Sequence, residues 1–263
     1  MTPEWVPGVD ASYDLLTPEI AQALKASGIQ VFAQCLWTGV EQPANRGVNL
    51  RNALEAGLAI IGYISIAPGQ TGAWHVVSGR AGLADDLWAA LIKVPIDVEL
   101  AGLTFVDVQS ALRRVALLGK PQDIYCNYNT WVNVLGNPLR PYATGLWNAL
   151  WNNDPANDFK SLPYGGWQES EVWGEQYTGA SAIEGLNADS DIFRAAALGI
   201  GDSPMPIITE KDLRMALIRM LAAGQYLVQP MGSANALGQA VAKITLADGS
   251  DPDPAIPALA VTL

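Results

Sequence analysis

The nine-residue stretch Leu58-Ala-Ile-Ile-Gly-Tyr-Ile-Ser-Ile66 bears most directly on the fold of this chain. Such near-continuous apolarity is typical of a parallel strand that is covered by protein on both faces. Strand-like and helix-like stretches alternate around it through the first two hundred residues. By pattern we expect strands over 6–10, 29–36, 58–66, 93–100, 123–126, 145–151 and 172–178, and helices over 17–27, 50–56, 81–91 and 104–118.

Repeated strand–helix units with short loops predict a mostly parallel sheet with helices outside it. A doubly wound sheet with a nucleotide is disfavoured, because no glycine-rich phosphate loop follows the first strand. The α/β pattern therefore favours a closed or nearly closed (β/α) barrel. In such barrels the chemistry gathers at the carboxyl ends of the strands.

The composition shifts near residues 199–206, which divides the sequence into two predicted parts. We expect residues 1–200 to form the barrel and residues 201–263 to form a small C-terminal appendage. The appendage has a predicted helix over 209–223 and a predicted strand over 240–246. Its last residues, 255–263, are apolar and uncharged, so we expect them to pack on the domain or on a partner chain. This makes residues 201–263 a candidate assembly or oligomerisation segment.

Charge and composition exclude several classes of protein. The chain has 263 residues, 15 Lys and Arg against 26 Asp and Glu, and a net charge of −11. Nucleic acids and anionic membranes attract cationic surfaces, so neither is an expected partner. One histidine and two cysteines cannot build the common zinc sites, and we expect no metal and no cofactor. Carboxylates are therefore the expected chemical groups.

The remaining predictions from composition concern location and three single residues. No apolar run is long enough for a membrane span, and residues 1–8 lack the features of a secretory signal, so we expect synthesis in a host cytoplasm. Cys35 and Cys126 are expected as small buried apolar residues, with a long-range disulfide left open. His75 is expected to be a solvated loop histidine, because it has no convincing partner for a nucleophile triad.

The sharpest chemical feature is Pro95-Ile-Asp97-Val-Glu99-Leu100. Residues two apart on a strand face the same way, with Cα atoms roughly 6.5–7 Å apart. Two neighbouring carboxyl groups raise each other's pKa, so one of them can stay protonated and act as a general acid. An acid pair on an exposed edge strand is the alternative. Asp10 alone is typical of a cap or turn residue, and the segment around Asp189 fits an Asx-turn equally well.

Several segments occur along the chain in an order that favours a functional role for Asp10 and Asp189 over a cap or a turn. They are Gly8-Val-Asp10-Ala-Ser12, Asp97-Val-Glu99, Glu175-Gln176-Tyr177-Thr178 and Asp189-Ser-Asp191-Ile-Phe193, supported by 56–63, Ile124-Tyr125 and Leu146-Trp147. Over residues 5–195 this order resembles glycoside hydrolase family 25, the Chalaropsis-type lysozymes common among bacteriophage lysins. The chain departs from the family pattern at Ile64, where a His is usual, and at Asp191, where Asn is frequent. It also lacks the usual basic residue in 34–39.

The resemblance implies an irregular (β/α) barrel that cleaves the β-1,4 bond between N-acetylmuramic acid and N-acetylglucosamine in peptidoglycan. It implies Glu99 as the general acid, Asp97 as its acidic partner, and Asp10 and Asp189 as further acids of the cleft. The implied substrate-binding residues are Tyr63, Tyr125, Trp147 and Gln176. Family members are thought to retain the anomeric configuration, and the substrate's own acetamido oxygen is one candidate nucleophile.

Two other hypotheses stay open at this point. One is a virion structural protein of a phage tail or surface, whose lysozyme-like domain binds the cell wall or degrades it locally. The other is a glycan-binding module without catalysis, since a fold can outlive its activity. The expected partners are peptidoglycan glycan strands, other virion proteins through residues 201–263, and a second copy of the chain in a homo-oligomer. The expected place of action is the bacterial cell wall.

Overall fold

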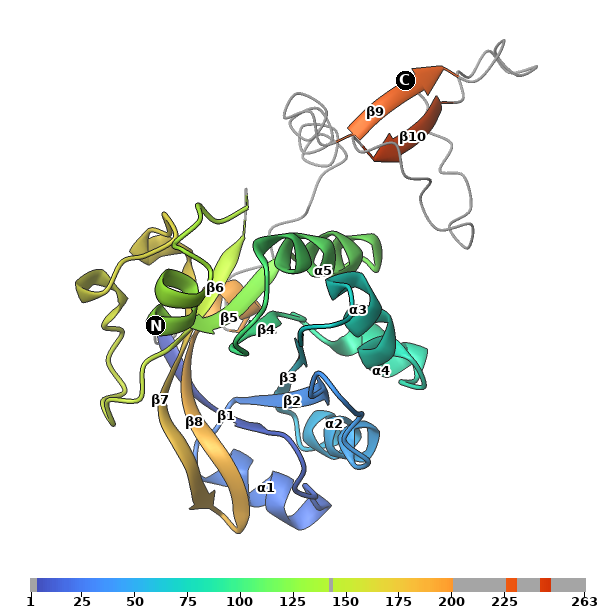
Figure 1. Ribbon diagram of the computed structural model, residues 1–263. Helices are drawn as coiled ribbons and strands as arrows, with labels where there is room; N and C mark the ends of the chain where they lie inside the picture. The colour runs from blue at the N-terminus through green and yellow to red at the C-terminus, as the bar shows by residue number, and fades with distance from the viewer. Residues whose placement is uncertain (1–3, 142–143, 201–225, 231–241, 247–263) are drawn as a thin grey trace. The chain divides into compact units, whose positions relative to one another are not determined.

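The computed structural model describes residues 4–141, 144–200, 226–230 and 242–246. The chain divides into two units, residues 1–203 and 204–263. The first unit contains a closed barrel of eight strands, coloured from blue to orange in Figure 1. The strands are β1 (Trp5–Ala11), β2 (Val31–Trp37), β3 (Ala59–Ser65), β4 (Ile96–Val98), β5 (Asp123–Asn127), β6 (Gly145–Ala149), β7 (Val172–Ile183) and β8 (Leu186–Arg194). The predicted α/β barrel is thus confirmed.

The strands stand in the barrel in their sequence order. Neighbours from β1 to β7 are parallel, while β8 is antiparallel to both β7 and β1 and closes the barrel between them. Five α-helices lie among the described residues of this unit: α1 (Pro18–Ala26), α2 (Arg46–Glu55), α3 (Gly72–Arg80), α4 (Asp85–Ala90) and α5 (Phe105–Leu117). Short helical turns lie at Thr130–Val134, Phe159–Ser161, Glu169–Glu171 and Ala195–Leu198.

Two helices begin where their capping residues predict. The Thr17 side chain accepts a hydrogen bond from the backbone N–H of Ile20, and Pro18 occupies the first helical position of α1. Thr104 and Asp107 form a reciprocal capping box at the start of α5. Each cap satisfies backbone N–H groups that the first turn of a helix leaves without partners.

The helix predicted over 81–91 is present only as a shorter helix, and the helix that precedes it is not predicted by the sequence pattern. The chain forms α3 earlier, at Gly72–Arg80, and then the short α4, at Asp85–Ala90. The apolar pattern of α3 is weak because glycines occupy positions where a side chain would clash. A Cβ on Gly72 would lie 1.9 Å from the backbone oxygen of Asp107 in α5, and one on Gly79 would lie 2.8 Å from Ile64. Close packing against α5 and β3 thus requires residues that weaken the sequence signal for a helix. The helix expected over 50–56 also begins earlier, since α2 starts at Arg46.

One end of the barrel is closed by aromatic and charged side chains, and we call this end the floor. Trp173 stacks on Phe193 with ring centroids 5.8 Å apart, and Gly8 passes so close that a Cβ would lie 2.4 Å from Phe193. The Lys93 ammonium binds the Asp123 carboxylate at 2.9 Å and lies 4.6 Å from the centre of the Trp173 ring. Asp123 and Trp173 stand at the beginnings of β5 and β7, so the floor lies at the amino ends of the parallel strands.

The cysteines and the histidine are all buried. Cys35 and Cys126 are free thiols, so the disulfide left open by the sequence is not formed, and burial raises the pKa of Cys35 to about 12. The prediction for His75 is wrong, because the residue lies within α3 with only 1% of its surface exposed. Its Nδ1 accepts a hydrogen bond from the Trp37 indole at 2.9 Å, and its Nε2 lies 2.9 Å from the carbonyl of Ala67. Burial lowers the pKa of His75, which suits a neutral ring that links α3 to the sheet.

In the second unit, β9 (Tyr226–Pro230) pairs with β10 (Ala242–Leu246) in an antiparallel ribbon. The strand predicted over 240–246 is therefore present and begins at Ala242. The helix predicted over 209–223 and the apolar tail over 255–263 lie outside the described residues. Across the parts of the chain that the structure describes, no helix combines the length and apolarity that crossing a membrane requires.

Candidate active site

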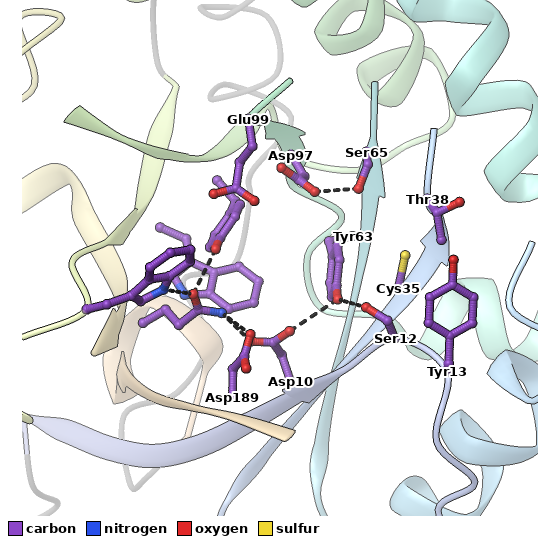
Figure 2. Close-up of a pocket in the computed structure, with 14 residues that line it drawn as sticks. Asp10, Ser12, Tyr13, Cys35, Thr38, Tyr63, Ser65, Asp97, Glu99 and Asp189 are labelled. Carbon is purple, nitrogen blue, oxygen red and sulfur yellow. Dashed lines mark hydrogen bonds between the residues drawn. The ribbon is translucent and has the colours of Figure 1, made fainter. Parts of the chain in front are cut away.

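A pocket of about 250 Å³ lies at the opposite end of the barrel from the floor, and we call this end the mouth. Its described lining residues are Asp10, Ser12, Tyr13, Cys35, Thr38, Tyr63, Ser65, Asp97, Glu99, Tyr125, Trp147, Trp151, Gln176 and Asp189. All eight site residues predicted from the sequence are among them. Figure 2 shows Asp97 and Glu99 on one side of this space and Asp10 and Asp189 on the other. The structure thus brings the predicted residues together, while their individual roles stay predictions.

Four acids reach the pocket from three strands. Asp10 on β1 stands directly opposite Asp189 on β8 in the strand register. Asp97 lies in the middle of β4, and Glu99 follows the last residue of that strand. The segment around Asp189 is therefore a strand and not an Asx-turn, because its backbone pairs with β1 and β7. None of the fourteen described lining residues is a Lys, Arg or His, so no cation among them neutralises these acids.

Gln176 on β7 connects two of the acids to the aromatic side of the pocket. Its Nε2 donates hydrogen bonds to Asp10 at 2.7 Å and to Asp189 at 3.0 Å. Its Oε1 accepts hydrogen bonds from the Tyr125 hydroxyl at 2.8 Å and from the Trp151 indole. These contacts use the full hydrogen-bonding capacity of the amide, which fixes its orientation. The carboxyl groups of Asp10 and Asp189 are thereby kept close together, because both accept a hydrogen bond from the same amide nitrogen.

Tyr63 holds the other oxygen of Asp10. The Tyr63 hydroxyl donates to Asp10 Oδ1 at 3.1 Å and lies 2.9 Å from the Ser12 hydroxyl. Burial raises the pKa of Tyr63 well above its usual value, so the phenol stays protonated and remains a donor. Asp10 is only 5% exposed, and burial together with the charge of Asp189 raises the pKa of Asp10 to about 7. The hydrogen bonds from Tyr63 and Gln176 lower the pKa of Asp10, but by less than burial raises it.

Asp97 and Glu99 form the second acidic pair. Asp97 is buried; its Oδ2 accepts a hydrogen bond from the Ser65 hydroxyl, while no N–H or O–H of the described residues donates to its Oδ1. Burial, and next the charge of Glu99, raises the pKa of Asp97 to about 8. Glu99 is half-buried and accepts a hydrogen bond from Asn127 at 3.1 Å. Burial raises the pKa of Glu99 as well, so the pair retains a proton near neutral pH.

The four tryptophans between residues 147 and 173 separate into three buried rings and one exposed ring. Trp147, which the sequence predicts as a sugar-binding residue, is 1% exposed, and its indole donates to Asp191 beneath the pocket at 3.1 Å. Trp167 and Trp173 are also buried and serve packing. Trp151 is 63% exposed and lines the pocket, yet the sequence does not single it out. Its sequence signals are its membership of the tryptophan-rich stretch 147–173 and its place two residues after the end of β6, because loops at that end of a barrel carry function.

The polar residues Ser12, Thr38 and Ser65 are lining residues that the sequence analysis missed. Each is the last residue of a parallel strand or follows one directly, which is the signal that could have revealed them. Within the described residues, no group of three or more His, Cys, Asp or Glu side chains is arranged to hold a metal ion. The four acids that line the pocket offer proton transfer and charge stabilisation by carboxyl groups.

The fold and the site together define an α/β barrel with an acid-lined pocket at the carboxyl ends of its parallel strands. No protein-family model and no curated protein matches the chain. Among solved structures, a lysozyme from Streptomyces coelicolor is similar at a TM-score of 0.59 and 16% identity, covering 76% of this chain and 98% of that one. A family GH25 lysozyme from Aspergillus fumigatus gives 0.57 and 18%, with 80% and 98% covered. A muramidase from Trichobolus zukalii gives 0.57 and 20%, with 74% and 99% covered. The barrel is therefore of the family 25 lysozyme type.

Proposed function

We propose that this chain is a peptidoglycan hydrolase that cleaves the β-1,4 bond between N-acetylmuramic acid and N-acetylglucosamine. One observation carries the proposal: Asp10, Asp97, Glu99 and Asp189 line a single pocket at the carboxyl ends of the barrel strands. Glycoside hydrolysis requires a carboxylic acid that protonates the leaving oxygen and carboxylates that stabilise positive charge at the anomeric carbon. The names of the similar structures, lysozyme and muramidase, support the choice of substrate.

In this mechanism Glu99 is the general acid. It is less buried than Asp97, so it reaches a substrate that enters from the mouth, and its raised pKa keeps it protonated at higher pH than an exposed Glu. As the glycosidic bond breaks, the leaving oxygen takes the proton of Glu99. A water molecule then gives its hydroxide to the anomeric carbon and its proton to the Glu99 carboxylate. Asp97 acts as the acidic partner: burial and the charge of Glu99 raise the pKa of Asp97, so the two carboxyl groups together retain a proton.

The other predicted residues hold the sugar and the developing charge. Asp10 and Asp189 supply the negative potential near the anomeric carbon, and Gln176 keeps them in place. Tyr63, Tyr125 and Trp147 form the packed wall beneath the sugar, since Trp147 meets both tyrosines edge to face at 6.0 and 4.8 Å. We add Trp151 to this set as the exposed ring on which a sugar face stacks.

The test is Glu99→Gln in the full chain, with Glu55→Gln as the matched control on the exposed end of α2. The substitution Glu99→Gln keeps the size of the side chain but leaves it unable to deliver a proton. We expect the release of reducing ends from purified peptidoglycan to fall by about 10²–10⁴-fold for Glu99→Gln and to stay unchanged for Glu55→Gln. Circular dichroism spectra should be identical for both. Undiminished hydrolysis by Glu99→Gln would remove the assignment, and sugar binding without turnover by the unaltered chain would favour a glycan-binding module.

The biological setting that we propose is a bacteriophage protein that acts at the bacterial cell wall, with residues 201–263 joining it to other virion proteins or to a second copy. The support is the net charge of −11, because an acidic surface gains nothing from long-range attraction to an anionic wall, whereas a tethered domain does not need that attraction. Sedimentation of the full chain against a chain that ends at residue 200 tests the tether. Identical oligomeric states and identical incorporation into particles would count against it.

A further inference from the structure

Asp191 is a buried acid next to the pocket that the mechanism above does not use. It lies on β8 two residues beyond Asp189, so both carboxyl groups project toward the same side of the strand. Its backbone pairs with Gly8 on β1 and with Gln176 on β7. The residue has no exposed surface and is absent from the pocket lining, so a substrate does not touch it. Any effect of Asp191 on catalysis must act through a neighbour.

The hydrogen bonds of Asp191 reveal a carboxyl group with too few donors. Trp147 donates its indole N–H to Asp191 Oδ1 at 3.1 Å. The other oxygen, Oδ2, is equally buried, and no N–H or O–H of the described residues donates to it. Within the described part of the chain, the carboxyl of Asp10, on the neighbouring strand β1, is the one group left with which Asp191 can form a further hydrogen bond. Two ionised carboxylates are both acceptors, so this hydrogen bond requires a proton on one of them.

The surroundings place that proton on Asp191. Asp10 accepts hydrogen bonds from Tyr63 and Gln176 and keeps slight contact with solvent, so it tolerates a negative charge better. Asp191 has the Trp147 indole alone. The titratable groups that face it are Asp10 on β1, Asp189 on β8 and Tyr125 on β5, and none of these is a cation. Burial, and next the charges of Asp10 and Asp189, raises the pKa of Asp191 well above its usual value.

We propose that Asp191 is a positioning residue that stays protonated. It accepts a hydrogen bond from the Trp147 indole and donates a hydrogen bond from its own carboxyl O–H to Asp10. The donated hydrogen bond stabilises the ionised form of Asp10 and fixes its carboxylate beneath the sugar. Asp10 then has three donors, namely Tyr63, Gln176 and Asp191. The role of Asp10 in this statement rests on the proposed function, whereas the location of the proton does not.

Two variants in the full chain separate this role from simple packing. Asp191→Asn keeps a donor for Asp10 and an acceptor for Trp147, and it has no proton to lose. We expect it to hydrolyse peptidoglycan within about threefold of the unaltered chain below neutral pH, and to lose one ionisation from the alkaline side of its pH profile. Asp191→Ala removes both hydrogen bonds, and we expect at least a roughly tenfold loss of kcat/KM. Equal losses in both variants, or an unchanged alkaline limb in Asp191→Asn, would overturn the proposal.

Infrared difference spectroscopy provides a readout that needs no activity. The spectrum of the unaltered chain minus that of Asp191→Asn should contain the carbonyl stretch of a buried protonated carboxylic acid at neutral pH. The matched control is Asp86→Asn on α4, where the hydrogen bond with Arg51 lowers the pKa of the exposed Asp86 carboxyl, so the difference spectrum should contain only carboxylate bands. A carboxylate band from Asp191 would refute the protonated state even in a fully active enzyme. Conversely, a carboxylic acid band in a chain without hydrolysis would uphold the proton and refute the proposed function.

Discussion

The two ends of this barrel treat buried charge in opposite ways. At the floor, the Asp123 carboxylate has a Lys93 ammonium 2.9 Å away, and the face of Trp173 covers that ammonium. At the mouth, four acids line one pocket without a Lys, Arg or His among the described lining residues. A paired buried charge is at least partly compensated by its partner, whereas acids that share a site raise the free energy of each other's ionised forms.

From this difference we predict that the floor contributes stability and the mouth contributes reactivity. At the floor, each buried charge has a partner of opposite sign within 2.9 Å. The raised pKa values of Asp10 and Asp97, about 7 and about 8, place proton exchange at the mouth near neutral pH. Sites of this kind commonly lower stability in return for function. A substitution at the floor should therefore lower stability and leave activity unchanged, whereas a substitution at the mouth should lower activity and raise stability.

The largest effect on stability should come from the floor. Lys93→Met leaves the Asp123 carboxylate buried without its partner, and we expect a loss of about 3–5 kcal/mol in the free energy of unfolding. Urea denaturation followed by tryptophan fluorescence measures it. Peptidoglycan hydrolysis per folded molecule should not change, since the pair lies away from the pocket.

The matched control is the double variant Lys93→Met with Asp123→Leu, which removes both charges and should recover most of the lost stability. If the single variant were as stable as the unaltered chain, the ion pair would contribute nothing and the contrast between the two ends would fail.

At the mouth, Asp97→Asn should abolish most hydrolysis and yet stabilise the protein at alkaline pH. The pKa of Asp97 is raised from 3.8 to about 8, so the folded state binds a proton that the unfolded state releases. The resulting contribution to stability is complete below about pH 4 and is lost as the pH rises through about 8. At pH 8 we expect the variant to be more stable by on the order of 1–3 kcal/mol, and near pH 4 we expect no such gain. Thermal unfolding at both pH values measures the difference.

The exposed acid Asp86 is the control for this experiment, because its pKa is lowered by its hydrogen bond with Arg51. Asp86→Asn should give no gain in stability at pH 8. An equal gain in both variants would show that the stabilisation comes from net charge and not from the buried site.

The smallest effect should come from the rim of the mouth. Trp151→Ala removes an exposed ring and one hydrogen bond to Gln176, so we expect KM for soluble glycan fragments to rise by about fivefold, with kcat changed less. Trp151→Phe keeps a stacking face and should recover part of the affinity. Steady-state kinetics measures KM and kcat for both variants, and isothermal titration with a chitin or peptidoglycan oligosaccharide measures their affinities. Unaltered affinity in Trp151→Ala would remove this ring from the binding surface.

The sequence best predicts those features that depend on interactions between residues close together in the chain. The caps Thr17 and Thr104 fix the starts of α1 and α5, and the acids Asp97 and Glu99 are close neighbours in the chain, so their common location follows from strand geometry. Alternation of strands and helices is enough to predict the barrel. The sequence does not predict the helix α3, because Gly72 and Gly79 are required by close packing against α5 and β3. That packing involves distant residues and leaves no local sequence pattern.

Contacts between distant residues set the rest of the site. The segment around Asp189 has no local feature that distinguishes a strand from an Asx-turn, and it becomes β8 only because β1 and β7 flank it. His75 is buried for a similar reason, since the Trp37 indole that binds it comes from another element. The burial of Trp147 likewise depends on rings from other strands, namely Tyr63, Tyr125 and Phe193. Such facts are not encoded within a window of neighbouring residues.

The antiparallel closure by β8 also determines when this protein can acquire its site during synthesis. Asp10 leaves the ribosome more than 160 residues before its strand neighbour Asp189 and its donor Gln176. Until then β1 has an open edge, and contacts that span most of the chain form slowly. The acids at the mouth thus meet only when the last strand arrives, so a nascent chain that stops short of β8 carries its carboxyl groups without a pocket.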